Sequence, residues 1–148
     1  MSEVPVAKRG REAMTETVLR FDGFELDLRR TVTARQRTQL RSLGLGRRFG
    51  IVTAFNPRGE ELPVSTNRRR LVRLARRLAA AGLAYQPADG LSIDRRHCER
   101  GFAVAADRRG VVSLGRAFDQ VAVFWFDGSR FLLVWCDRPG RGLPLPAL

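Results

Sequence analysis

Several residue types are scarce in this 148-residue chain, and each scarcity excludes a class of protein. The two cysteines, Cys98 and Cys136, are too few for a disulfide framework, so both are expected to be reduced thiols. No run approaches the roughly 20 apolar residues of a membrane span. The N-terminus also lacks the apolar core of a signal peptide. We therefore expect a cytoplasmic protein with no membrane segment.

Residues that hold metals and nucleotides are scarce too. His97 is the only histidine, and no spacing of Asp, Glu or Cys suggests the further ligands that a zinc site would need. The chain has no glycine-rich phosphate loop, which argues against nucleotide binding of the P-loop or Rossmann type. We predict neither a metal nor a cofactor.

Acidic residues are few relative to basic ones, 15 against 27, which gives a formal net charge of +12. Lys8 is the only lysine, so arginine carries almost all of the excess. Such a skew often reflects a GC-rich genome, which raises the arginine content without any anionic partner. A charge of this size still favours encounters with polyanions. Nucleic acid is therefore one candidate partner.

The apolar pattern predicts one α/β domain over residues 17–137, between a mobile basic tail (1–16) and an irregular Pro- and Gly-rich tail (138–148). The fold class expected is α+β (mixed α/β): a single mixed, mainly antiparallel sheet of five or six strands with about three helices packed on it. Strands are predicted over residues 17–28 (bent, or a hairpin at Asp22-Gly23), 49–55, 83–85, 97–105, 121–126 and 131–136. Helices are predicted over residues 33–43, 66–81 and 108–118, and a surface loop over 86–96.

The segment 51–59 organises this pattern. Its first half, Ile51 to Phe55, is apolar on both faces and predicts a central strand. Its second half is a loop in which Pro57 is expected to hold Asn56 in an extended conformation. Open α/β sheets usually place ligands where strand ends feed helices, so a site is expected here.

Four polar residues around this loop are the best candidates for ligand binding: Thr53, Asn56, Arg58 and Asn67. The following helix, capped by Ser65 or Thr66, would offer free N–H groups to an anion. Arginine can add bidentate contacts to a phosphate or carboxylate. The alternative is that both asparagines hydrogen-bond loop backbone and cap the helix.

The segment His97-Cys98-Glu99 invites a catalytic interpretation. On a strand, His97 and Glu99 share one face and could form an acid/base pair. Cys98 would share the other face with Phe102 and Val104, and should point into the core. A surface histidine beside a carboxylate is the alternative. Gln120 could reach the same sheet edge as Asn56 or tie a helix end to a strand, and we prefer the tie.

The helix predicted over residues 66–81 has two faces. Leu71, Leu74, Ala75 and Leu78 recur at helical spacing and form a buried stripe. The remaining circumference carries Arg69, Arg73, Arg76 and Arg77. These arginines either solvate the outer face or contact nucleic acid.

Four blocks of residues occur in order: Thr53-Ala54-Phe55-Asn56-Pro57; Asn67 with the arginines after it; Glu99 with Gly101-Phe102-Ala103-Val104; and Leu114-Gly115-Arg116-Ala117-Phe118 through Gln120 to Ala122 and Trp125. Over roughly residues 49–134 they resemble an uncharacterised, mainly bacterial family catalogued as domain of unknown function 3293. Two positions depart from its pattern. Asp119 stands where the family usually has glycine, and Thr66 where an acidic residue commonly precedes Asn67. The resemblance implies no particular activity.

The leading functional hypothesis is a small domain that binds a polar, anionic small molecule in a cleft formed by the 53–67 loop, Glu99 and Gln120. If a reaction takes place, Glu99, with His97 beside it, would do the acid/base work and Arg58 would neutralise charge. The sequence does not decide whether the chain is an enzyme, nor its oligomeric state. The first alternative is a nucleic-acid-binding module that uses the N-terminal tail and the helix 66–81. The second is an interaction subunit for an acidic protein partner.

Overall fold

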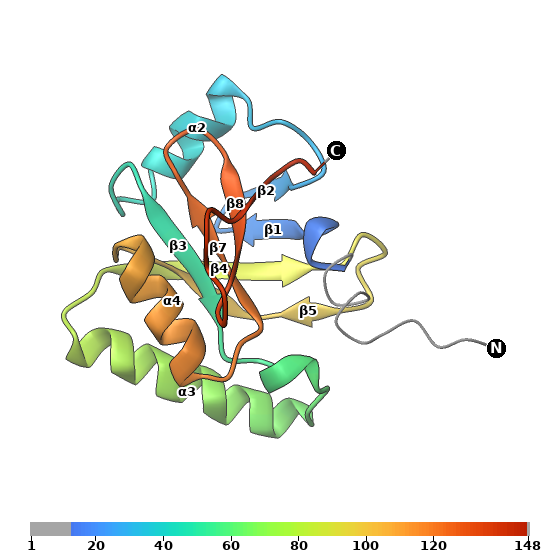
Figure 1. Ribbon diagram of the computed structural model, residues 1–148, viewed down its shortest axis with the longest axis vertical. Coiled ribbons are helices and arrows are strands. Elements are labelled where there is room, and N and C mark those ends of the chain that lie inside the picture. Colours follow the sequence, from blue (N-terminus) through green and yellow to red (C-terminus); the bar gives the residue numbers. More distant parts are fainter. Residues whose placement is uncertain (1–12, 148) are drawn as a thin grey trace.

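The computed structural model describes residues 13–147. Its framework is a nine-stranded sheet in the order β2-β1-β4-β6-β3-β7-β8-β9, with β5 paired to β4 (Figure 1). Every pairing is antiparallel. The strands are β1 (Val18–Phe21), β2 (Phe24–Asp27), β3 (Phe49–Thr53), β4 (Tyr85–Leu91), β5 (Cys98–Glu99), β6 (Gly101–Val104), β7 (Ala122–Phe126), β8 (Phe131–Trp135) and β9 (Leu143–Pro144). The helices include α2 (Ala34–Arg41), α3 (Val64–Ala80) and α4 (Arg108–Ala117), with the 3₁₀ turn η1 (Pro57–Gly59) between β3 and α3.

The α+β mixture of helices and strands is present, but the prediction of a mixed sheet with five or six strands was wrong. Residues 17–28 form two strands, as the hairpin alternative had it, and residues 97–105 are divided at Arg100 into β5 and β6. The segment 86–96, predicted as a loop, contributes most of β4. Its Pro87 pairs with β6 where β1 does not reach, and a residue without an N–H is tolerated beside such an open edge.

The C-terminal segment also differs from the irregular tail that was predicted. Leu143 and Pro144 pair with β8, and Leu145 is buried. At the other end, residues 1–12 of the predicted tail lie outside the described part of the chain. Met14 already packs against the core. Within residues 13–147, no helix is long and apolar enough to cross a membrane.

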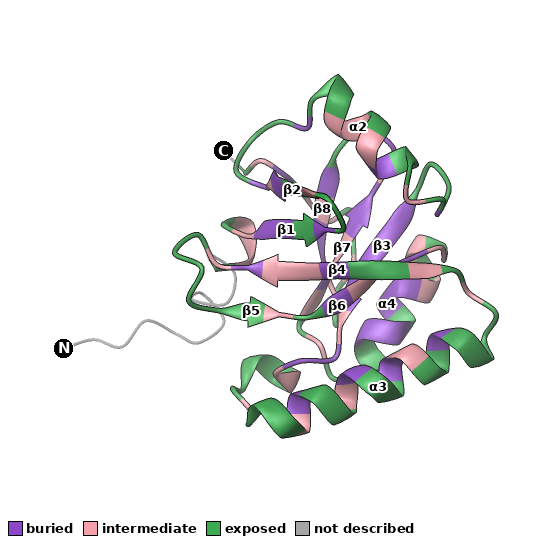
Figure 2. Cartoon of the chain, turned by 180° about the vertical axis from the view of Figure 1, so that it is seen from behind, coloured by how far each residue is buried: buried purple, intermediate pink, exposed green. Residues whose placement is uncertain are grey.

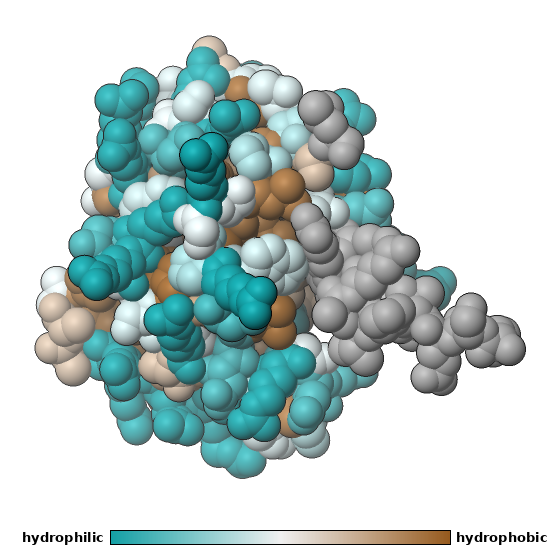
Figure 3. All heavy atoms as spheres, viewed as in Figure 1, coloured by the Kyte–Doolittle hydropathy of each residue, from teal (hydrophilic) through white to brown (hydrophobic). Residues whose placement is uncertain are grey.

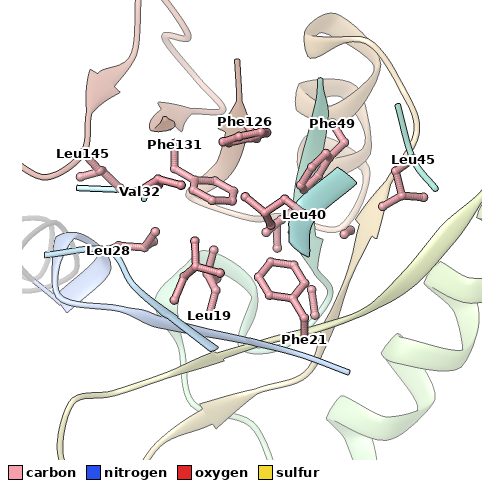
Figure 4. Packing of buried hydrophobic residues seen from close by; sticks show 14 of the residues in the cluster. Leu19, Phe21, Leu28, Val32, Leu40, Leu45, Phe49, Phe126, Phe131 and Leu145 are labelled. Atoms are coloured by element: carbon pink, nitrogen blue, oxygen red, sulfur yellow. The ribbon is translucent and has the colours of Figure 1, made fainter. Parts of the chain in front are cut away.

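The sheet curls into a half-barrel, and its inner face holds one of two hydrophobic cores. Leu19 of β1 and Leu133 of β8 come from opposite ends of the sheet, yet they belong to one buried cluster. Leu40 of α2 and Leu145 close this cluster (Figure 4). The alternation along β3 places Phe49 and Ile51 on this inner side.

The second core lies between the outer face of the sheet and the helices α3 and α4. Val52 and Val104 from the sheet pack against Leu74 and Leu78 of α3 and against Val111 of α4. The buried residues of α3 therefore lie on the side that faces the sheet, and its other side is exposed (Figure 2). β3 carries buried residues on both faces, which confirms the prediction of a central strand.

Local signals at the helix starts had mixed success. A capping box is present at the start of α2, because Thr33 and Gln36 satisfy each other's backbone N–H groups. Asp107 caps α4 by accepting a hydrogen bond of 2.7 Å from Gly110 N. Ser65 and Thr66 do not cap α3, because that helix already begins at Val64, directly after Pro63. The chain therefore enters α3 without a side-chain cap.

Candidate functional site

The loop after β3 has an unusual backbone. Asn56 adopts a left-handed conformation (φ 49°, ψ 62°), and so does Arg58 (φ 58°). The expected extended conformation of Asn56 was therefore wrong. Asparagine tolerates this region better than most residues, and its side chain here makes several hydrogen bonds that hold it. Positive φ at non-glycine residues is strained and tends to occur at functional sites.

Asn56 joins three separate segments of the chain. Its Nδ2 donates to Glu99 Oε1 at 3.0 Å. Its Oδ1 accepts from Leu62 N at 3.1 Å and from Asn67 Nδ2 at 2.9 Å. Its backbone N–H donates to Asn67 Oδ1 at 3.0 Å. The loop, the first turn of α3 and the end of β5 are thus locked together.

Asn67 is the one buried polar residue within residues 13–147, with 5% of its surface exposed. Besides its two bonds to Asn56, its Nδ2 also lies 3.3 Å from Leu62 O. Both asparagine amides are therefore engaged with protein groups, as the alternative interpretation had it. Their role is to fix the shape of the loop.

Glu99 is the titratable group at the centre of this cluster. It is partly buried, and burial raises the pKa of its carboxyl, although the hydrogen bond from Asn56 and the charge of His97 act in the opposite direction. Its Oε1 accepts from Asn56, whereas Oε2 has no hydrogen-bond partner within residues 13–147. By contrast, hydrogen bonds from Arg95 and Arg29 lower the pKa values of Glu25 and Asp27. Glu99 thus retains one free oxygen.

Thr53 and Gln120 hold the same loop from its two sides. The Thr53 hydroxyl donates to Arg100 O at 2.6 Å and accepts from Phe55 N at 3.0 Å. Gln120 Nε2 donates to Phe55 O at 3.0 Å and to Phe118 O at 3.1 Å. Gln120 thus joins the end of α4 to the loop after β3, directly beside Asn56, and so combines features of the two interpretations. Neither side chain forms a hydrogen bond with Glu99.

Arg58 projects from the loop into solvent. Its backbone N–H donates to Asp119 O at 2.7 Å, and its guanidinium lies 3.8 Å from the Asp119 carboxylate. With 70% of its side chain exposed, it is available to an incoming group. Asp119 itself has φ 56°, a left-handed backbone that glycine adopts more readily than any other residue.

Arg70 is a structural residue that the sequence did not single out. Its Nε donates to Ala54 O and its NH2 group to Phe118 O, both at 2.6 Å. Arg70 precedes Leu71 of the buried stripe, and this was the only sequence signal that separated it from its exposed neighbours. It fastens α3 to both the β3 loop and the end of α4.

His97 and Cys98 are both exposed. Cys98 was expected to point into the core, and this was wrong. It does follow the alternation of Phe102 and Val104, but α3 and α4 pack around Val104, and Cys98 instead lies 3.8 Å from Arg20. Although the residue is exposed, partial desolvation of its thiol and the charge of Asp89 raise the pKa of Cys98, which disfavours a thiolate nucleophile.

The second thiol, that of Cys136, is buried. Burial raises the pKa of Cys136 to about 11. Both cysteines are free. In the part of the chain that the structure describes, no three or more His, Cys, Asp or Glu residues cluster closely enough to hold a metal ion.

The arginines predicted on the outer face of α3 are where the sequence placed them. Arg69, Arg73, Arg76 and Arg77 are all exposed, and Arg68 joins them. An open groove of about 400 Å³ runs along this face, lined by Arg68, Arg69, Val72, Arg73 and Arg76. It is separate from the cluster around Glu99.

These features define an α+β domain in which a curled antiparallel sheet carries a rigid polar cluster at the end of its central strand. Residues 52–123, just under half of the chain, match the family model described as "Protein of unknown function (DUF3293)". The chain is therefore similar to that family over a shorter span than the four motif blocks suggested. Comparisons with curated proteins and with solved structures gave no match. The motif residues Thr53, Asn56, Asn67, Glu99 and Gln120 together build the cluster.

Proposed function

We propose that the cluster around Glu99 binds a small polar molecule that carries both a hydrogen-bond donor and an anionic group. The observation that carries this proposal is the carboxyl of Glu99, which is partly buried and holds one oxygen without a partner within residues 13–147. A ligand N–H or O–H would pair with this Oε2. Perturbed titratable groups of this kind concentrate at functional sites.

The roles of the other residues follow from their hydrogen bonds. Asn56 and Asn67 have engaged amides, so they hold Glu99 and the loop in place and leave the ligand to other groups. Arg58 is exposed and has only a distant ion pair with Asp119, so it would meet the anionic group. Thr53 and Gln120 hold the loop through hydrogen bonds to the backbone of Phe55. The rule for parallel α/β sheets that first suggested this location does not apply to an antiparallel sheet; the proposal therefore depends on the cluster alone.

If the ligand is a substrate, Glu99 is the group for acid/base chemistry. A pKa above the ordinary value of a glutamate brings the carboxyl closer to the range where it can both accept and donate a proton. His97, two residues away and exposed, lies close enough for its charge to affect that carboxyl. It would be the second partner in such a pair.

A thermal-shift screen tests the proposal. Amino acids, sugar phosphates, nucleosides and small hydroxy acids would be added to the wild-type chain and to two variants, Glu99→Gln and Glu61→Gln. Glu61→Gln is the matched control, because Glu61 is an exposed carboxylate in the same loop. A ligand at 100 times its Kd should stabilise the folded state by about 2.7 kcal/mol. We expect stabilisation of the wild type and Glu61→Gln, and little or none of Glu99→Gln.

Glu99→Gln keeps an oxygen for the Asn56 hydrogen bond, so the fold should be retained. The proposal is excluded if every stabilising compound acts equally on Glu99→Gln, or if none stabilises the wild type.

A further inference from the structure

The exposed side of α3 has a charge pattern that the Glu99 cluster does not explain. The helix has 17 residues, of which six are arginines and none is acidic. Arg70 is used internally, and the other five point outward. Within residues 13–147, none of these five forms an ion pair. In the same part of the chain, the only side-chain hydrogen bond of these five joins Arg69 to the hydroxyl of Thr66.

Several arginines on or beside the sheet, by contrast, are paired with carboxylates. Arg20 pairs with Asp89 at 3.0 Å, and Arg95 pairs with Glu25 at 2.8 Å. Arg29 likewise pairs with Asp27 at 2.8 Å. The helices α2 and α4 also lack carboxylates, but each has only two exposed arginines, whereas α3 has five. Among these three helices, the exposed unpaired charge is therefore concentrated on α3.

We propose that the outer face of α3, defined by Arg68, Arg69, Val72, Arg73, Arg76 and Arg77, binds the phosphate backbone of nucleic acid. Arg69 and Arg76 lie about 10 Å apart along the helix axis. Duplex DNA carries one charge per roughly 1.7 Å of its axis, so several phosphates fall within that length. The guanidinium group offers paired donors that match a phosphate.

An acidic protein fits this face less well. Stable protein interfaces are anchored by buried aromatic and large apolar side chains. Here α3 has no aromatic residue, and Val72, which is 49% exposed, is the only large apolar side chain among the groove residues. Hydrophilic side chains dominate the surface over α3 in the space-filling view (Figure 3). The face thus has charge without an apolar anchor.

The absence of aromatic residues on α3 also limits how nucleic acid would be recognised. Proteins that bind single-stranded nucleic acid stack its bases on aromatic side chains. Arginines spread along a helix without such a platform contact phosphates, which carry no sequence information. We therefore expect binding that depends steeply on salt and only weakly on base sequence.

The test compares two triple variants that each lower the formal net charge from +12 to +9. One is Arg69→Gln, Arg73→Gln and Arg76→Gln on α3. The other is Arg35→Gln, Arg41→Gln and Arg48→Gln on and after α2, at the opposite end of the molecule (Figure 1). Fluorescence anisotropy would measure affinity for a 20-base-pair DNA duplex, its single strand and an RNA duplex, from 25 to 200 mM salt.

We expect the α3 variant to lose most of the affinity and to flatten the plot of log K against log salt by up to about 2.7, at roughly 0.9 per phosphate contact on duplex DNA. The α2 variant should stay close to the wild type. A third variant with lysine at positions 69, 73 and 76 keeps the charge and should retain most of the binding. Because all three positions are exposed, thermal unfolding should not change; single substitutions replace any triple variant that does unfold.

Several results would overturn the proposal. One is no binding to any nucleic acid at 25 mM salt, and another is an equal loss in both glutamine variants. Equal or tighter binding of polyglutamate would point to an acidic protein. Binding to vesicles rich in phosphatidylserine, without binding to nucleic acid, would point to a membrane surface. None of these outcomes bears on Glu99, so this proposal can fail while the small-ligand proposal stands.

Discussion

Asn56 and Asn67 hold each other by two hydrogen bonds that run in opposite senses. The backbone N–H of Asn56 donates to Asn67 Oδ1 at 3.0 Å, and Asn67 Nδ2 donates back to Asn56 Oδ1 at 2.9 Å. Through this pair the first turn of α3 fixes the loop that presents Asn56 Nδ2 to Glu99. Hydrogen bonds thus connect α3, which carries the outer arginines, to the carboxyl of Glu99 through Asn56.

Replacing Asn67 by alanine should lower the free energy of unfolding by about 2–3 kcal/mol, because buried donors and acceptors in the loop lose their partners. Urea denaturation measures this change. Ser65→Ala is the control: Ser65 is exposed two residues earlier in the same helix, and its loss should change stability by less than about 0.5 kcal/mol. Similar values for the two variants would show that the asparagine pair does not hold the loop.

Sequence patterns are most informative about features that form within a single segment of the chain. The buried stripe of α3, the capping box of α2 and the hairpin of β7 and β8 all follow from residues close together in the sequence. The strand β4 was missed because Pro87, Asp89 and Gly90 are turn residues by composition. Neighbours on both sides, β1 and β6, hold them in a strand all the same. In β4, pairing with the neighbouring strands therefore outweighs the turn preference of these residues.

For the candidate site, sequence patterns named the residues but not their partners. Asn56 and Glu99 are 43 positions apart, and only the packing of β3 beside β6 brings them together. The left-handed backbone at Asn56 runs against the usual preference of a residue before proline, so no local rule predicts it. Arg70 differs from Arg69 only in the direction it faces. Long-range contacts decide each of these cases.

Gly101, from the third motif block, lies where two neighbouring strands approach closely. A Cβ atom there would lie 2.5 Å from Val52 O and 3.2 Å from Ala88 O. Gly101→Ala should therefore destabilise the fold by about 2–3 kcal/mol, since backbone atoms must move apart. In Gly90→Ala, in the same sheet, the new Cβ meets nothing closer than 3.6 Å. That variant should be neutral or more stable by about 0.5 kcal/mol. Chemical denaturation of both proteins would contradict this account if Gly101→Ala were as stable as Gly90→Ala.

Asp119 provides a test of backbone strain next to the site. With φ 56°, a non-glycine residue pays a conformational cost of about 1 kcal/mol, which glycine avoids. Its ion pair with Arg58 is exposed and 3.8 Å long, so little is lost with the carboxylate. Asp119→Gly should raise the unfolding free energy by about 0.5–1 kcal/mol, whereas Asp119→Ala should lower it. Thermal unfolding of the three proteins should give the order Gly, Asp, Ala; a more stable alanine variant would exclude strain as the cause.

The pH dependence of stability tests the environment of Glu99. Burial raises the pKa of the folded carboxyl above the 4.5 of an unperturbed glutamate, so the folded state binds the proton more tightly than the unfolded state. The stability that this carboxyl contributes is therefore greatest at low pH, and it falls as pH rises from 4.5 through the folded pKa.

Glu99→Gln removes the charge and keeps an acceptor for Asn56 Nδ2. Relative to wild type, this variant should become progressively more stable between pH 4.5 and 8 in urea titrations. Glu61→Gln, which alters an exposed carboxylate of the same loop, should show no such trend. If the stability of Glu99→Gln relative to wild type instead declined with rising pH, Glu99 would be stabilised as an anion, and the proposed free acceptor would already have a partner.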